Sequence, residues 1–169
     1  MPNVKIADAE LNYRLDGPVD APVLALSNSL GTHLEMWDAQ VPAFSKQFRV
    51  LRYDTRGHGG SSVTPGPYSV EQLGRDVLAL ADALGIDRFA FCGLSMGGLI
   101  GQWLAINAGE RLTRLVICNT GAKIGIDEVW NDRIDTVLKG GEQAMRNMRY
   151  ASISRWFTPA FAEQQPEQA

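Results

Sequence analysis

Hydrophobic residues fall into two patterns along most of this chain. Short continuous apolar runs are typical of strands that are buried on both faces. Between these runs, apolar residues recur at every third or fourth position, as they do along one side of a helix. Because the two patterns alternate, they predict an α/β fold with a mostly parallel sheet flanked by helices. The expected strands lie at residues 23–26, 48–53, 89–92 and 115–118, and the helical spacing lies at residues 33–47, 69–84 and 99–108.

Two further segments complete the expected organisation. Residues 4–15 alternate loosely between apolar and polar positions and predict a hairpin. Residues 126–157 carry scattered large hydrophobic side chains without a strand pattern, and we expect two or three short helices there, separated at Gly140-Gly141. Ser69 and Gly85 predict the first and last boundaries of the helix that lies between them.

Composition disfavours some classes of partner and location but does not identify a function. The 169 residues are 45% hydrophobic and 21% charged, as in an ordinary globular protein, and the net charge of -3 disfavours nucleic acid or an anionic membrane as a partner. No apolar run approaches the roughly 18 residues of a membrane span, and the first residues do not resemble a signal peptide. Cys92 and Cys118 lie in apolar runs, which predicts buried thiols rather than a disulfide framework. We therefore expect a cytoplasmic protein.

The most informative stretch is Phe91-Cys92-Gly93-Leu94-Ser95-Met96-Gly97-Gly98, which contains G-x-S-x-G. It directly follows an expected buried strand and opens an apolar helix, and this context is the one that a nucleophile elbow requires. In such a turn Ser95 takes a strained backbone conformation, and Gly93 and Gly97 leave room for it. The sequence therefore predicts Ser95 as a nucleophile. The alternative, a glycine-rich turn that binds phosphate, lacks the lysine typical of such loops.

A serine that attacks an acyl group also needs an oxyanion hole. The N–H of Met96, directly after the nucleophile, is one expected donor. The second is expected from the loop that follows the strand at residues 23–26, and the N–H of Leu30 is the candidate. Each such donor contributes about 3 to 4 kcal/mol to the transition state. Farther along, Asp54 and Arg56 are expected to pair or to hold their own loop, in a structural role.

These motifs together resemble those of the α/β-hydrolase family, and the match covers nearly the whole chain. Within that family the sequence is similar to the 3-oxoadipate enol-lactonases. The resemblance implies that Ser95 attacks the carbonyl of an enol-lactone, that Leu30 and Met96 hold the oxyanion, and that water then releases 3-oxoadipate during bacterial breakdown of aromatic compounds. It implies no metal and no organic cofactor. The stretches that carry the enol-lactonase resemblance are 27–32, 36–37, 51–54, 119–123 and 155–159.

The family places its catalytic acid and then its histidine after the serine. This chain has only His33 and His58, and both precede Ser95. We therefore expect residues 1–121 to form the N-terminal part of the hydrolase core and residues 122–169 an incomplete helical cap, truncated before the acid and the base. A second chain is one possible source of the missing part. Because a serine without its base is a poor nucleophile, these residues alone are expected to be almost inactive.

Two classes of function remain open at this point. The first is a hydrolase, either the enol-lactonase itself or another carboxylesterase or haloperoxidase-like enzyme with the same elbow. The second is a non-catalytic α/β binding fragment that keeps the pocket and lacks the triad. A phosphate or nucleotide binder is a weaker third alternative.

Overall fold

The computed structural model describes residues 2–166, which fall into two compact units divided between Lys123 and Ile124. The first unit holds a six-stranded sheet in the order β1-β2-β4-β3-β5-β6. The four strands β4, β3, β5 and β6 are parallel, and β2 pairs antiparallel with both β1 and β4. The strands are β1 (Asn3–Lys5), β2 (Glu10–Asp16), β3 (Val23–Ser27), β4 (Arg49–Tyr53), β5 (Phe89–Leu94) and β6 (Leu112–Cys118).

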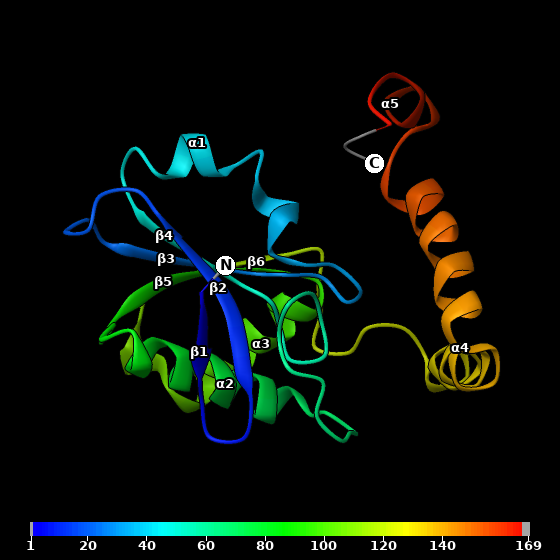
Figure 1. The fold of residues 1–169 in the computed structure, drawn as a ribbon, viewed down its shortest axis with the longest axis horizontal. Helices are drawn as coiled ribbons and strands as arrows, with labels where there is room; N and C mark the ends of the chain where they lie inside the picture. Colours follow the sequence, from blue (N-terminus) through cyan, green and yellow to red (C-terminus); the bar gives the residue numbers. More distant parts are fainter. Residues whose placement is uncertain (1, 167–169) are drawn as a thin grey trace. The chain divides into compact units, whose positions relative to one another are not determined.

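Helices cover the two faces of this sheet. Figure 1 shows α2 (Val70–Ala83) and α3 (Met96–Asn107) on one face, and the short helices η1 (Leu34–Trp37) and α1 (Val41–Phe44) on the other. A short helix η2 (Gly109–Arg111) leads into β6. The mostly parallel sheet with flanking helices that the alternating pattern predicts is thus confirmed.

Local sequence accounts for the main helix of the first unit. The Ser69 side chain accepts a hydrogen bond from the N–H of Gln72 at 3.0 Å, so Ser69 is the N-cap of α2 as predicted. Gly85 follows the helix with a φ of +68°, a conformation that favours glycine. The inward side of α2 packs on the sheet with the buried residues Leu73, Val77, Leu80 and Ala81.

The sheet follows a doubly wound topology. The connection from β3 to β4 runs through η1 and α1 on one face, and the connection from β5 to β6 runs through α3 on the other. Because β3 and β5 are neighbours, their connections part at the carboxyl ends of these two strands. In open α/β sheets this is the position at which ligands bind.

Several boundaries differ from the sequence prediction. Helix α3 begins at Met96 rather than at residue 99, because the glycines after Ser95 form its first turn despite their low helix propensity. Residues 33–47 form only the two short helices η1 and α1. The strand expected at residues 115–118 begins at Leu112, and its expected burial is wrong: Leu115, Val116 and Ile117 are 36%, 52% and 46% exposed.

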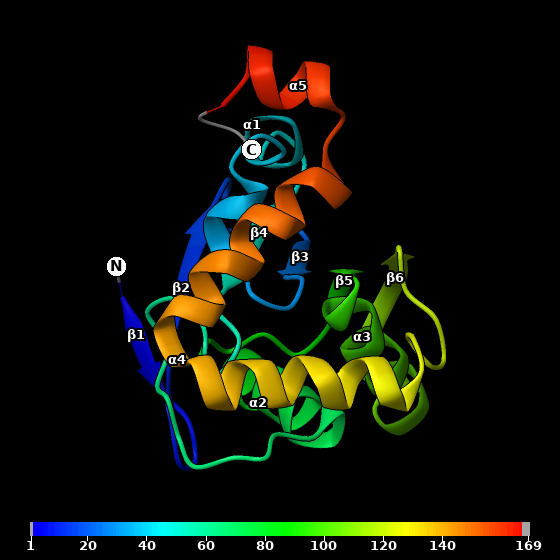
Figure 2. The same ribbon diagram turned by 90° about the vertical axis from the view of Figure 1, so that its right-hand side faces the viewer.

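The second unit contains α4 (Asp127–Trp156) and α5 (Pro159–Gln164). Helix α4 consists of two arms that meet at Gly141, whose φ of 54° and ψ of -137° are not helical, and Figure 2 shows the bend between them. This break agrees with the predicted separation at Gly140-Gly141. No helix within residues 2–166 combines the length and the apolar character needed to cross a bilayer.

Candidate active site

Ser95 sits alone between β5 and α3 in an uncommon backbone conformation. Its φ is 55° and its ψ is -110°, outside the regions that L-residues favour. Such a conformation costs on the order of 1–3 kcal/mol and persists only where its surroundings enforce it. Here the Ser95 N–H donates to the carbonyl of Cys118 at 2.9 Å, and the Ser95 carbonyl accepts from the Thr120 hydroxyl at 2.9 Å. The strained turn expected from the motif is therefore present.

The flanking glycines are required by the closeness of neighbouring backbone. A Cβ on Gly93 would lie 2.1 Å from the carbonyl oxygen of Gly97, and a Cβ on Gly97 would lie 2.3 Å from the carbonyl oxygen of Ser27. A Cβ on Gly98 would lie 2.6 Å from the Thr120 side chain. Gly93 and Gly97 thus allow the turn to pack against itself and against the end of β3.

The elbow is joined to the loop that follows β3. The Gly97 N–H donates to the carbonyl oxygen of Asn28 at 3.0 Å. Within residues 2–166, neither the Leu30 N–H nor the Met96 N–H donates a hydrogen bond to the protein. Both amides are therefore available to a negatively charged oxygen, and that of Met96 lies in the first turn of α3, where the helix dipole favours negative charge.

Asn28 anchors this loop, and the sequence prediction did not single it out. Its side-chain N–H group donates to the carbonyl of Tyr53 at 2.9 Å, and its side-chain oxygen accepts from the indole N–H of Trp37 at 2.9 Å. The adjacent Ser27 hydroxyl lies 2.7 Å from the Tyr53 hydroxyl, and burial raises the pKa of that phenol. An amide directly after a buried strand was the only signal in the sequence.

Of the two predicted alternatives, pairing with each other or holding their loop, Asp54 and Arg56 follow the second, each through other partners. The buried Asp54 carboxylate accepts hydrogen bonds from the N–H of Leu34 at 2.7 Å and the N–H of Gly60 at 2.8 Å. Arg56 binds Asp76 and Asp8 instead, with nitrogen–oxygen distances of 2.7–2.9 Å. These carboxylates raise the pKa of Arg56, and Arg56 lowers that of Asp8. Both residues therefore hold the loop, in the structural role that was predicted.

Neither histidine forms a hydrogen bond with the serine. The Nε2 of His58 accepts a hydrogen bond from the N–H of Gly31 at 3.0 Å, and the exposed His33 lies 3.7 Å from a carboxylate oxygen of Glu35. Within the described range, the Ser95 hydroxyl forms no hydrogen bond, so neither histidine is engaged with it as a base. The same residues contain no cluster of three or more histidine, cysteine or acidic side chains suited to a metal ion.

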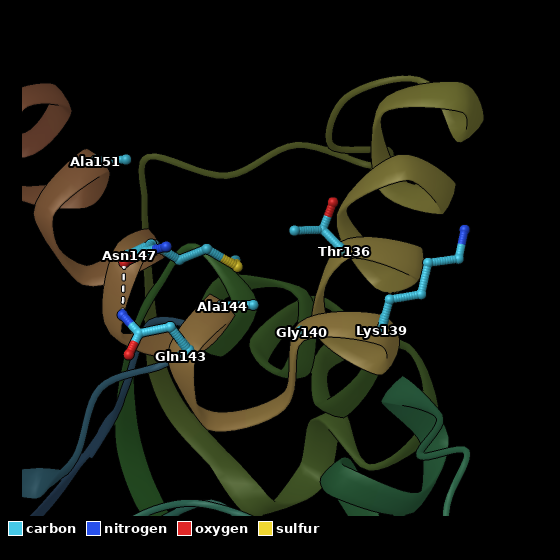
Figure 3. Close-up of a pocket in the computed structure, with 8 residues that line it drawn as sticks. Thr136, Lys139, Gly140, Gln143, Ala144, Asn147 and Ala151 are labelled. Atoms are coloured by element: carbon cyan, nitrogen blue, oxygen red, sulfur yellow. Dashed lines mark hydrogen bonds between the residues drawn. The ribbon is translucent and has the colours of Figure 1, made fainter.

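The second unit has a groove of its own where the two arms of α4 meet. Its volume is about 600 Å³. Figure 3 shows Thr136 and Lys139 on one arm and Gln143 and Asn147 on the other, with the Lys139 side chain directed away from the second arm. Gln143 donates to Asn147 at 3.0 Å. The groove is open and carries no titratable group apart from Lys139 among its lining residues, so it offers binding surface rather than acid–base chemistry.

Known proteins with similar sequences are hydrolases. The alpha/beta hydrolase fold family matches residues 22–165. The 3-oxoadipate enol-lactonase 2 of Acinetobacter baylyi is 49% identical over 160 residues, which are 95% of this chain and 59% of the relative. The 3-oxoadipate enol-lactonase 1 of the same organism is 41% identical over 151 residues, which are 89% of this chain and 55% of the relative.

Solved structures agree with this match. A hydrolase from Pseudomonas aeruginosa PA01 is 51% identical to this chain and superposes with a TM-score of 0.91. The match covers 97% of this chain and 62% of the Pseudomonas chain. The enol-lactonase from Burkholderia xenovorans LB400 is 50% identical with a TM-score of 0.91, over 98% of this chain and 63% of its own. This chain therefore spans about three fifths of the length of these relatives. On its fold, its elbow and these matches, the chain belongs to the α/β-hydrolase fold family.

Proposed function

We propose that this chain carries the nucleophile and the oxyanion hole of a serine hydrolase that opens lactones. The observation that carries the proposal is Ser95 held at a φ of 55° in a strand-to-helix turn whose neighbouring amide, that of Met96, is unoccupied. The Leu30 amide supplies the second donor from the loop that is bonded to Gly97. Such a paired arrangement stabilises an oxyanion that forms beside the serine.

The reaction proceeds in two steps on this serine. The Ser95 oxygen attacks the carbonyl carbon, its proton passes to a base, and the negative charge on the carbonyl oxygen is held by the two amides. The lactone C–O bond then breaks, and the enol oxygen takes the proton. Water attacks the resulting acyl ester, which releases the acid and restores the serine hydroxyl.

3-oxoadipate enol-lactone is the substrate we propose, with 3-oxoadipate as the product. Two relatives of 49% and 41% identity are named as 3-oxoadipate enol-lactonases, and the structure from Burkholderia is named as an enol-lactonase. We further propose that the base and the acid come from sequence corresponding to the remaining two fifths of these relatives, in the same chain or in a second one. The family order of serine, acid and histidine supports this placement.

Activity assays test the proposal directly. Two proteins are assayed with the enol-lactone and with a simple aryl ester. One is the 169-residue chain, and the other is this chain extended with the unmatched C-terminal part of the Acinetobacter enol-lactonase 2. We expect turnover of the lactone only in the extended form, and a loss of roughly a million-fold on Ser95→Ala. Near-normal lactone turnover by the 169-residue chain would show that the missing base is not needed. A preference for the aryl ester would favour another carboxylesterase.

A non-catalytic binding fragment is the second candidate. The observation that favours it is that the Ser95 hydroxyl forms no hydrogen bond among the described residues. In that case the lactone binds to the chain and stays intact, and the extended form gains no activity. Titration of the lactone into isotopically labelled protein, followed by nuclear magnetic resonance and by product analysis, separates binding from hydrolysis.

A further inference from the structure

His58 joins the loop that follows β4 to the loop that follows β3. Its Nε2 accepts a hydrogen bond from the Gly31 N–H at 3.0 Å, and its Nδ1 lies 3.1 Å from the carbonyl oxygen of Arg56. The contact with Gly31 links residues 27 positions apart in the sequence. The imidazole is thus one of the side chains that join the two loops at the carboxyl edge of the sheet, together with Asp54, which accepts from the Leu34 N–H at 2.7 Å.

The two contacts together favour one tautomer of the neutral ring. A backbone N–H only donates, so Nε2 carries no proton, and a carbonyl oxygen only accepts, so Nδ1 carries one. Only the neutral tautomer protonated at Nδ1 satisfies both partners. An imidazolium would direct a second N–H at the N–H of Gly31 and break the link.

The loop that presents the ring is itself tightly held. The His58 N–H donates to the carbonyl of Thr55 at 2.9 Å, and the His58 carbonyl accepts from the Ser61 N–H at 3.0 Å. The backbone carbonyl of Arg56 accepts the hydrogen bond from Nδ1. The side chain of the same residue is 1% exposed and forms ion pairs with two carboxylates. His58 is therefore a fixed support rather than a mobile surface side chain.

Gly31 is the position at which the opposite loop needs such a support. Its φ is +80°, and a Cβ there would meet no atom within 4 Å, so neither a side chain nor close packing restrains it. The hydrogen bond to His58 fixes the plane of the peptide that joins Leu30 to Gly31. Behind it, the Thr32 hydroxyl closes the turn by donating to the Ser29 carbonyl at 2.8 Å.

We propose that His58 is a positioning residue for the oxyanion hole, and that its neutral ring holds Gly31 so that the adjacent Leu30 N–H keeps its orientation. The inference rests on the proposed hydrolase function, because Leu30 has this role only if Ser95 is acylated. His58 does not touch the reacting atoms. It acts through Gly31 on one of the two donors.

The first test is spectroscopic and uses the 169-residue chain. With only two histidines, the ring nitrogens give two pairs of signals, one pair from each imidazole, and the exposed His33 serves as the internal reference. We expect His58 to show a protonated Nδ1 and an unprotonated Nε2. We also expect Gly31 amide exchange to be slow in the native chain and fast in His58→Ala. A protonated Nε2, or unchanged exchange, overturns the link.

The second test measures slow acylation of Ser95 by p-nitrophenyl acetate, followed as an increase in intact mass. His58→Ala is expected to slow acylation between about tenfold and a hundredfold, since one donor loses its alignment. His58→Gln, whose amide oxygen reaches the place of Nε2, restores most of the rate, whereas the shorter His58→Asn does not. His33→Ala is the matched control and leaves the rate unchanged.

The outcomes distinguish the two proposals. Equal acylation of native chain and Ser95→Ala overturns the nucleophile, and the role of His58 falls with it. Acylation that depends on Ser95 but is unaffected by His58→Ala overturns the role of His58 alone. Equal rates in His58→Asn and His58→Gln also overturn it, because a contact at Nε2 would then not matter.

Discussion

At the scale of single residues, the elbow depends on glycines that cannot carry a side chain. At Gly97 the added side chain would clash with β3, because a Cβ there would lie 2.3 Å from the backbone oxygen of Ser27. This backbone belongs to the sheet and cannot move aside. We expect Gly97→Ala to lower the free energy of unfolding by about 3 kcal/mol. Urea unfolding measures the change. Gly109→Ala is the control, since a Cβ there meets nothing within 4 Å, and an equal loss in both variants would contradict the explanation.

Cys92 provides a second test at this scale. Burial is the main cause that raises the pKa of the Cys92 thiol to about 11, and the neighbouring Cys118 adds to the shift. The reactive thiolate is therefore roughly one part in a thousand at pH 8 and grows as the pH rises toward that pKa. We expect iodoacetamide to alkylate Cys92 far more slowly in the folded chain than in urea at pH 8. Peptide mass spectrometry reads the rate, and equal rates in the two states would refute the shift.

The residues of the candidate site were unequally predictable. Ser95, Gly93 and Gly97 stand in one short motif, so their local geometry followed from sequence. The partners of Arg56 did not, because Asp76 and Asp8 lie 20 and 48 positions away and only the fold brings them together. The contact between His58 and Gly31 was missed for the same reason.

At the scale of elements, Arg56 ties the loop after β4 to α2 and to the turn before β2. Its guanidinium is 1% exposed and binds Asp76, which is itself buried, and the more exposed Asp8. We expect Arg56→Ala to cost about 3–5 kcal/mol, because it leaves a buried carboxylate without its partner. Arg75→Ala removes an exposed pair with Glu71 on α2 and a contact with the Trp103 ring, and is expected to cost about 1 kcal/mol or less. Thermal and urea unfolding of both variants check this, and similar losses would show that burial does not decide the effect.

Element boundaries were predicted best where one local rule applied. The N-cap Ser69 and the glycine that follows α2 belong to this kind. The start of α3 was placed too late, because the fold extends the helix through glycines that disfavour it. Residues 33–47 were overestimated as a helix, since the spacing of their apolar side chains reflects packing of two short helices on the sheet.

At the scale of the whole molecule, the order of the strands brings the separate site loops together. Neighbouring β3 and β5 end beside each other with connections on opposite faces, so the loop with Leu30 and the elbow with Ser95 meet at one edge. The parallel sheet was predictable from the alternation of patterns. The strand order was not, because apolar runs alone do not specify which strands become neighbours.

The same order leaves β6 at one side of the sheet, with no strand beyond it among residues 2–166. Leu115, Val116 and Ile117 expose much of their apolar surface there, and the outer N–H and C=O groups of the strand are open to pairing. An exposed apolar edge of this kind is a template for association between chains. We therefore expect the 169-residue chain to self-associate with rising concentration in sedimentation velocity experiments.

A charged substitution on β6 tests whether strand pairing at this edge causes the association. Val116→Lys places an ammonium group in the middle of β6 and is expected to shift the chain toward monomer, because pairing would bury that charge. Val63→Lys is the matched control, since Val63 is 83% exposed in a loop and does not belong to β6. Monomer restored by Val116→Lys but not by Val63→Lys assigns the association to the β6 edge. If both variants restore it, net charge rather than strand pairing controls the association, and if neither does, another surface is responsible.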